Sequence, residues 1–378
     1  MNGSKIRVGI VGANADQSWA AAAHLPALAH LPEFQLTAVA TTRQATAERA
    51  AEAFQARHAF DNAHALATHP DVDLVVVTVK APGHAEAVRA AASAGKHVLC
   101  EWPLGVDLTE ATELAAAVGG TGVVHAIGLQ GYHSPAAAFV RDLLAEGRIG
   151  RLQAASLVAA GDPLGGATIS PSLAWSLDPA AGNTLLTIMV GHFLSTLEHV
   201  TGPVTELSAT VANLHPQVTV TGTGERLDSG APTQVALHGR LADSAVVSLT
   251  VQGGSGPGDG GFFLRLAGTD GALTITPSPS PAFLHWTDWR IQLTSGAGQP
   301  AELRVPDRYR VAPPGVPPGP PANVAALYRE VADAITARRP AHPSFHTALR
   351  QHRLLAAIEQ AAETGGRLRI DTEGVVLA

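Results

Sequence analysis

The first third of the chain alternates short apolar runs, rich in β-branched residues, with Ala-rich segments of helical periodicity. This alternation predicts βαβ units and a parallel sheet. The run VDLVVVTV is almost unbroken, as expected for a central strand that is covered on both faces. Strands are predicted at residues 6–11, 35–40, 74–79, 97–100 and 123–127. The helices between them are predicted at residues 19–29, 45–55, 85–94 and 108–117.

After Gly128 the pattern changes to one helix followed by longer β-like runs. The helix spans residues 134–146, with Ser134 as N-cap and Pro135 in the first turn. The runs alternate imperfectly and are joined by turn residues, which predicts a mostly antiparallel sheet with a helix at 185–201 laid against it. These runs are residues 152–160, 204–214, 233–241, 245–252, 262–266 and 273–276.

The chain closes with predicted helices at 324–338 and 345–363 and a short strand at 367–371. Gly- and Pro-rich segments at 253–261 and 312–323 are typical of loops or linkers. We therefore expect an α/β protein with a Rossmann dinucleotide-binding domain over residues 1–128. Residues 129–378 should form an α+β domain with a large open-faced, mostly antiparallel sheet, its C-terminal helices packing back on the first domain.

Composition narrows the function classes. The hydrophobic share of 46% and the charged share of 15% indicate a globular chain, and the net charge of −7 gives no reason to expect direct nucleic-acid binding. A single cysteine, Cys100, excludes an internal disulfide and fits a reducing compartment. The sequence shows neither a signal-peptide pattern nor an apolar run of membrane-spanning length, so we expect a cytoplasmic protein. No H-x-H, H-E-x-x-H or Cys/His cluster is present, and no metal is expected.

The first predicted strand runs into a glycine turn and then a helix. Gly12 ends the strand, Asn14 stands where a second glycine is usual, and the helix begins near Ser18 and Trp19. Glycine lets backbone approach a pyrophosphate closely, and the helix N-terminus offers free N–H groups to it. Asn tolerates left-handed backbone angles, so the turn is compatible with dinucleotide binding. An ordinary βα turn is the alternative.

The residues at the end of the second predicted strand indicate which coenzyme is preferred, NAD or NADP. An acidic residue there binds the ribose hydroxyls of NAD, whereas small polar residues with arginine suit a 2′-phosphate. Here the strand ends with Thr41, Thr42 and Arg43 and no acid, which favours NADP. Alternatively, Arg43 is only a solvated residue at a helix start.

Six segments together carry a likeness to a known family. They are the helix residues His24-Leu25-Pro26, VKAPGH at 79–84, AGKHVLCEWP at 94–103, and the stretches 134–152, 191–202 and 346–365. On these segments the chain resembles the Gfo/Idh/MocA oxidoreductase family. The resemblance implies a Rossmann domain paired with an open-faced sheet, NAD or NADP as coenzyme, sugars, inositols or related polyols as substrates, and homo-oligomers formed through the open sheet.

The long turn from Gly12 to Trp19, VKAPGH, the tripeptide ending at Pro103 and LQGYHSP at 129–135 resemble most the Gal80-like branch of that family. This branch implies a second function, a dinucleotide-binding transcriptional regulator that acts through protein contacts. The resemblance thus leaves an enzyme with a small-molecule substrate and a silent regulator with a protein partner both open. A dimer or tetramer is expected in either case.

Two positions depart from the family pattern. Trp102 stands where the family has a catalytic lysine, and Ser195 replaces the acid that follows His192 in the family's G-x-H-x-x-D motif. Only Lys5, Lys80 and Lys96 occur in the chain, and Lys80 follows the central strand at the end where ligands bind. We therefore expect Lys80 to be desolvated and to act as the acid/base group, with His192 as second proton carrier. The alternative is that Lys80 only binds ribose or water.

The expected site residues fall into three sets. The catalytic set is Lys80 and His192. The substrate set is Tyr132, His133, His192 and Ser195, of which Tyr132 and His133 have packing as their alternative role. The coenzyme set is Gly12, Asn14, Ser18, Trp19, Thr41, Thr42, Arg43, Lys80, His84, Glu101 and Trp102, with Glu101 on a ribose. Core packing is the alternative for Trp19, and His24 reads as a packed helix residue.

Overall fold

The computed structural model describes residues 5–16, 18–161, 164–254, 261–278, 283–296 and 298–377. Most of the predicted linker at 253–261 lies outside these residues. The chain divides into two compact units. The first consists of Met1–Gln130 and Val311–Leu349, and the second of Gly131–Arg310 and Arg350–Ala378.

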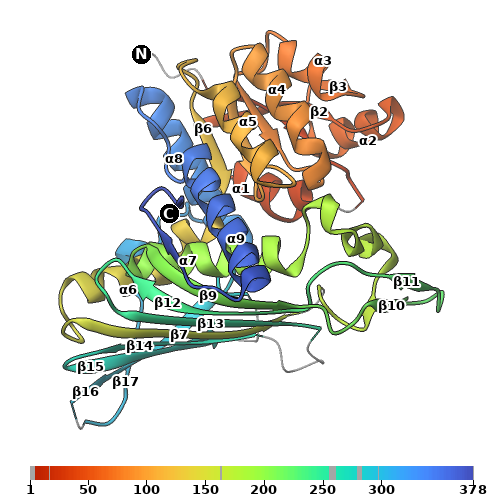
Figure 1. Ribbon diagram of the computed structural model, residues 1–378. Helices are drawn as coiled ribbons and strands as arrows, with labels where there is room; N and C mark the ends of the chain where they lie inside the picture. The colour runs from red at the N-terminus through yellow and green to blue at the C-terminus, as the bar shows by residue number, and fades with distance from the viewer. Residues whose placement is uncertain are drawn as a thin grey trace. The chain divides into compact units, whose positions relative to one another are not determined.

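The described part of the first unit contains a six-stranded parallel sheet with the strand order β3-β2-β1-β4-β5-β6 (Figure 1). Chain order reverses between β1 and β4, and in such sheets ligands bind at the carboxyl ends of the strands beside this point. The predicted strands are all present, and a short edge strand, β3, is added. The bounds are β1 Ile6–Val11, β2 Phe34–Ala40, β3 His58–Phe60, β4 Leu74–Val77, β5 His97–Glu101 and β6 His125–Gly128.

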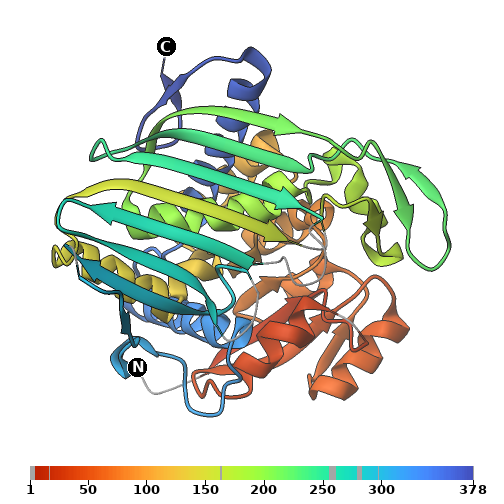
Figure 2. The same cartoon turned by 90° about the horizontal axis from the view of Figure 1, so that it is seen from below.

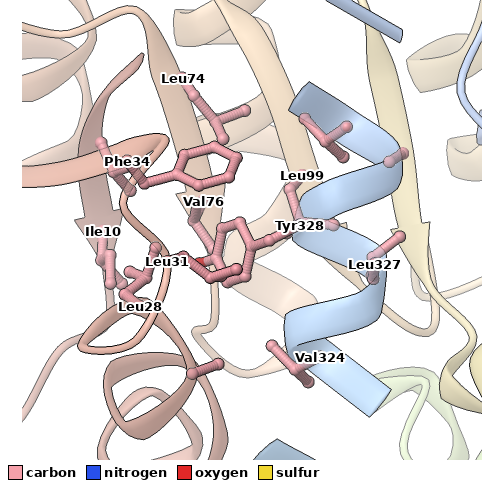
Figure 3. Close-up of a cluster of buried hydrophobic side chains, with 14 of the residues drawn as sticks. Ile10, Leu28, Leu31, Phe34, Leu74, Val76, Leu99, Val324, Leu327 and Tyr328 are labelled. Atoms are coloured by element: carbon pink, nitrogen blue, oxygen red, sulfur yellow. The ribbon is translucent and has the colours of Figure 1, made fainter. Parts of the chain in front are cut away.

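Helices of the first unit follow the strands, and one arrives from the far end of the sequence. Tyr328 of that helix is fully buried, and its ring centroid lies 5.1 Å from that of Phe34 (Figure 3). The apolar face of the helix thus completes the core over β1, β4 and β5. The elements are η1 Ala20–His24, α1 Leu25–Leu28, α2 Gln44–Phe54, α3 Ala63–Thr68, η2 Ala81–Gly83, α4 His84–Ser93, α5 Leu108–Val118 and α8 Pro320–Ala337.

The described part of the second unit contains a ten-stranded sheet in which only β7 and β13 pair in parallel. Its order is β17-β16-β15-β14-β7-β13-β12-β9-β18-β19. The bounds are β7 Leu152–Gly161, β9 Val204–Ala212, β12 Gln234–Leu241, β13 Val246–Gly253, β14 Gly261–Gly268, β15 Gly271–Ser278, β16 Asp288–Ser295, β17 Ala301–Leu303, β18 Leu368–Ile370 and β19 Val376–Leu377.

Helices cover one face of this sheet and leave the other open (Figures 1 and 2). Side chains alternate accordingly: Leu237 and Leu249 are buried opposite one another, whereas the cross-strand neighbours Val158 and Phe263 are 49% and 43% exposed. The covering helices are α6 Pro135–Ala145, η6 Leu185–Val190 and α7 Gly191–Thr201. Helix α9, Phe345–Thr364, begins in the first unit and ends in the second. A small separate sheet consists of β8 Thr168–Ile169, β10 Gln217–Val220 and β11 Arg226–Asp228. The 3₁₀ turns are η3 Gln130–His133, η4 Pro171–Leu177, η5 Pro179–Ala181 and η7 Asp307–Tyr309.

The predicted fold class is confirmed: a Rossmann-type parallel sheet is joined to a mostly antiparallel one. Pro179–Thr201 has the length and hydropathy of a membrane span, but 72% of its most apolar window is buried inside the protein. That segment is therefore the covering helix of the second sheet.

Candidate functional site

The glycine turn after β1 is held in a conformation that only glycine adopts easily. Gly12 has a φ of +100°, and a Cβ added there would lie 2.9 Å from both the backbone nitrogen and Cγ1 of Val79. Its neighbour Asn14 donates its backbone N–H to the Gly12 carbonyl at 2.9 Å and accepts the Asp16 N–H on Oδ1 at 3.1 Å. The Asn14 side-chain oxygen therefore shapes the turn.

Ser18 fixes the entry to the helix that follows. Its hydroxyl donates to the Asn14 carbonyl at 2.8 Å and accepts the backbone N–H of Ala21 at 3.1 Å. The second of these bonds is of the N-cap type, so Ser18 connects the Asn14 carbonyl to the first turn of the helix. Trp19 is partly buried and packs against the main core of the first unit, which favours the packing role among the two expected for it.

The end of β2 presents polar side chains without a carboxylate. Thr41 donates its backbone N–H to the Phe60 carbonyl, and its hydroxyl lies 2.5 Å from that of Thr46. Thr42 and Arg43 are exposed at the start of α2. The groups available to a ligand here are therefore a hydroxyl and a guanidinium.

Lys80 lies at the carboxyl end of β4 but is exposed, which does not match the desolvated lysine expected from the sequence. The chain leaves the sheet at this point, because the Lys80 carbonyl accepts the Gly83 N–H at 2.8 Å and starts the turn η2. Lys96 lies at the amino end of β5, where its ammonium donates to the carbonyls of His69 and Val72. Lys80 is thus the lysine at the carboxyl edge.

His84 is buried and faces backbone rather than the edge. Its Nδ1 lies 2.7 Å from the carbonyl oxygen of Pro103, and its Nε2 lies 2.9 Å from that of Val79. Burial lowers the pKa of this imidazole. The neutral ring has one N–H to donate and both nitrogens lie against backbone oxygens, so His84 contacts the segment after β4 and the segment after β5.

Glu101 is the buried centre of a side-chain network at the end of β5. His24 Nε2 lies 3.0 Å from one carboxyl oxygen, and Gln130 donates to the other at 2.8 Å. His24 Nδ1 in turn lies 3.0 Å from the hydroxyl of Tyr328. The tautomer of His24 that carries its proton on Nε2 donates to the carboxylate and accepts the Tyr328 hydroxyl on Nδ1. Next to this network, Trp102 is 5% exposed and has a cis peptide bond to Pro103.

In the second unit, His192 is buried on the first turn of α7, with its ring stacked on that of His285 at a centroid distance of 3.9 Å. Burial lowers the pKa of His192 to about 3, so the ring is neutral at physiological pH. Its Nδ1 has no hydrogen-bond partner among the described residues. The Ser195 hydroxyl donates to the His192 carbonyl at 3.0 Å, so it stays within the helix.

Tyr132 and His133 belong to the turn η3, which packs closely on α7. A Cβ added to Gly131 would overlap the hydroxyl of Thr196, so the glycine backbone of the turn packs directly on the Thr196 side chain of the helix. The Tyr132 ring centroid lies 4.3 Å from that of His199, and burial raises the pKa of Tyr132. These contacts favour the packing alternative for Tyr132.

The predicted site residues fall into two groups, one in each unit. The carboxyl ends of β1, β2, β4 and β5 carry the predicted coenzyme residues. Sequence reasoning missed Gln130, Tyr328 and His285, and took His24 for a packed residue only. A histidine within the apolar run AAAAHLPAL was the one available signal for a buried polar network.

The first unit fits a nicotinamide dinucleotide. The glycine at position 12 allows the turn to pack directly on the backbone after β4, the capped helix follows, and Thr42 and Arg43 lie at the end of the neighbouring strand β2.

Comparison with known proteins agrees with this geometry. The family model described as "Oxidoreductase family, NAD-binding Rossmann fold" (GFO_IDH_MocA) matches residues 6–129, and the model of the Gal80p C-terminal domain matches residues 135–277. The dehydrogenase aclE of Aspergillus oryzae is 32% identical over 252 residues, which are 64% of this chain and 68% of that protein. This chain belongs to the Gfo/Idh/MocA oxidoreductase family.

Within the family the chain is close to the Gal80-like branch, as the sequence predicts. The galactose/lactose regulatory protein GAL80 of Saccharomyces cerevisiae is 28% identical over 271 residues, 67% of this chain but 62% of that protein. A super-repressor mutant of Gal80p superposes with a TM-score of 0.85 at 22% identity, covering 98% of this chain and 99% of the other. Levoglucosan dehydrogenase with NADH and L-sorbose gives a TM-score of 0.82 at 20% identity, covering 97% and 99%. Both of these structures have the same fold as this chain.

Replacing Gly12 by alanine is expected to weaken coenzyme binding about tenfold or more, equivalent to roughly 1.4 kcal/mol, because the new methyl group meets the Val79 backbone. Gly95→Ala is the matched control: Gly95 also has a positive φ, +67°, but nothing lies within 4 Å of its Cβ position. Both variants carry backbone strain of about 1–2 kcal/mol. Coenzyme titration followed by fluorescence gives the affinity of each variant. An equal loss of affinity in both would contradict the proposal that the Gly12 turn binds the coenzyme.

The His192 pKa of about 3 predicts a pH-dependent stability. The unfolded chain takes up a proton at this residue below about pH 6.5, whereas the folded protein does not, so the contribution is present above pH 6.5 and is lost as the pH falls towards 3. His192→Phe keeps a ring on His285 and removes the titration. It should reduce the slope of unfolding free energy against pH, between pH 6 and 4, by up to about 1.4 kcal/mol per unit. An unchanged slope in urea melts would argue against a neutral buried ring.

Proposed function

We propose that the protein is an NAD(P)-dependent oxidoreductase, with NADP preferred, that transfers hydride between the nicotinamide and a sugar or polyol-like substrate. The observation that carries this proposal is the carboxyl edge of the parallel sheet, which combines a glycine cradle at Gly12 with an exposed lysine, Lys80, one residue beyond Val79. The substrate class is inferred from the family and from the sugar ligand named for levoglucosan dehydrogenase. A cytoplasmic homo-oligomer is part of the proposal.

The preference for NADP rests on the end of β2. Thr42 and Arg43 are exposed there, and the Thr41 hydroxyl is engaged by Thr46. A 2′-phosphate matches the guanidinium by charge and by hydrogen bonding, whereas NAD binding generally uses a carboxylate at this position.

The coenzyme, when bound, supplies or accepts the hydride. The chain's own part is to move the proton of the reacting oxygen. In the reducing direction the Lys80 ammonium donates its proton to the carbonyl oxygen as that oxygen becomes a hydroxyl, and in the oxidising direction the amine takes the proton back. Burial keeps His192 neutral, so in this proposal it is not the acid that protonates the reacting oxygen.

A second candidate function is a dinucleotide-binding regulator without catalysis. Two observations favour it: a buried Trp102 occupies the family's lysine position, and the Ser195 hydroxyl is directed to the helix backbone, which leaves His192 without an acidic partner in the helix. The match to the Gal80p C-terminal domain is consistent with it. Such a protein would bind the coenzyme and a protein partner without turnover.

Coenzyme choice is tested by Arg43→Ala. Loss of a charge-assisted contact worth about 1.5–3 kcal/mol should lower the affinity for NADP roughly tenfold to a hundredfold and leave NAD binding nearly unchanged. Arg57→Ala removes an exposed arginine just before β3 and serves as control. Calorimetric titration with both coenzymes gives the affinities. Tighter binding of NAD by the unmodified protein would refute the NADP preference.

Turnover is tested with purified protein, both coenzymes and a panel of aldoses, inositols, anhydrosugars and their keto forms. Lys80→Met should abolish coenzyme reduction or oxidation even at saturating coenzyme, and Lys80→Arg should restore little, because a guanidinium does not exchange its proton near neutral pH. Lys5→Met, an exposed lysine at the amino end of β1, should leave the rate unaltered. Saturable coenzyme binding without turnover on the whole panel would favour the regulator.

A further inference from the structure

A cluster of metal-binding side chains lies at the β3 edge of the parallel sheet, away from the strand ends that carry the proposed coenzyme residues. His58 belongs to β3, His69 follows α3, and Asp71 precedes β4. Each offers a ligand atom, and these atoms all lie within 4.8 Å of one another. We propose that His58, His69 and Asp71 bind a divalent transition-metal ion of the zinc class.

The donor set fits that class of ion. Two imidazole nitrogens with one carboxylate oxygen suit Zn²⁺, Co²⁺ or Ni²⁺, whereas Mg²⁺ and Ca²⁺ prefer oxygen alone. In a tetrahedral zinc site with bonds of about 2.0–2.1 Å, two ligand atoms are separated by about 3.4 Å. His58 Nε2 lies 3.1 Å from Asp71 Oδ2, so this pair already has nearly the required spacing. All three residues are partly exposed, which lets water complete the coordination.

Asp71 is oriented before any ion binds. Arg7 holds the other carboxyl oxygen, Oδ1, at 2.9 Å, and the buried hydroxyl of Thr37 donates to the Asp71 carbonyl at 2.7 Å. Arg7 also bonds Asp73, so its charge is shared by two carboxylates and Oδ2 of Asp71 stays directed to His58. Hydrogen bonds of this kind orient the carboxylate ligands of metal sites.

The two histidines approach each other closely. Their ring centroids are 4.1 Å apart with the planes inclined by 44°, and the Phe60 ring packs against both. The position of His69 is fixed through its backbone, since Lys96 donates to its carbonyl at 3.3 Å. Its Nδ1 accepts the Asp71 N–H at 3.2 Å, a long hydrogen bond that the ring gives up or keeps depending on which nitrogen binds the ion.

The site connects parts of the chain that no short motif would join. The edge strand β3 has three residues and pairs only with β2, and a shared ion would tie it to the segment that leads into β4. The inference is independent of the proposed function, because none of the three residues belongs to the coenzyme or substrate sets.

The test is a titration of untagged, full-length protein with Co²⁺, followed by visible absorption, and then displacement by Zn²⁺. The unmodified protein should bind one equivalent of Co²⁺ with the intense bands of a four-coordinate site. His58→Gln and Asp71→Asn should each weaken binding at least about tenfold, in line with the loss of one ligand from three. His64→Gln on α3 removes an exposed histidine that lies outside the cluster and should behave as the unmodified protein does.

Thermal melting gives a second readout that does not depend on the spectrum. Zn²⁺ should raise the melting temperature of the unmodified protein and of His64→Gln, but not that of His58→Gln, since an ion that binds only the folded state stabilises it. The proposal is overturned if the unmodified protein shows no saturable one-equivalent binding. It is equally overturned if His58→Gln and Asp71→Asn, folded by circular dichroism, bind Co²⁺ as tightly as the unmodified protein.

Discussion

The close approach of the β1 terminus to the backbone after β4 is the constraint on which the candidate coenzyme site depends. Gly12 makes it feasible, because any side chain there would overlap Val79. The approach places the phosphate-type turn directly beside the residue that precedes Lys80. A single backbone contact therefore brings the cradle and the exposed lysine to one edge of the sheet, where parallel sheets bind their ligands.

The second organising feature is the buried carboxyl group of Glu101. Both of its oxygens are engaged, by His24 and Gln130, and the chain of contacts ends at Tyr328 in the core. A buried carboxylate without such partners would be costly, so the network lets a polar group remain at the end of β5. The same contacts bear on the ribose-binding role expected of Glu101, because a ribose hydroxyl would have to share an oxygen that already has a partner. The neighbouring Trp102 is buried, and the family's lysine chemistry has no equivalent at that position.

Much of the fold could be predicted because long apolar runs mark central strands. β1 was predicted residue for residue, and α5 and α9 to within one residue. β3 was missed because its three residues, His-Ala-Phe, are too few to show a strand pattern. Its first residue, His58, is one of the three proposed metal ligands. The location of the expected coenzyme residues at strand ends follows from the strand pattern of the sequence, whereas the partners of Glu101 at positions 24, 130 and 328 are distant along the chain and carry no such pattern. The desolvated Lys80 was expected from the apolar run before it, whereas the Pro82 turn takes the residue into solvent.

The discontinuity of the first unit has a consequence for its biosynthesis. Its sheet is complete once residue 130 has been made, yet Tyr328 and its neighbours on α8, which cover the apolar surface over Phe34, Leu74 and Leu99, come much later. During translation this part of the core lacks the side chains of α8 while the whole second sheet is being synthesised. Exposed apolar surface of this kind is what makes partly folded chains prone to aggregation, so the late synthesis of α8 makes this part of the core the vulnerable one during folding.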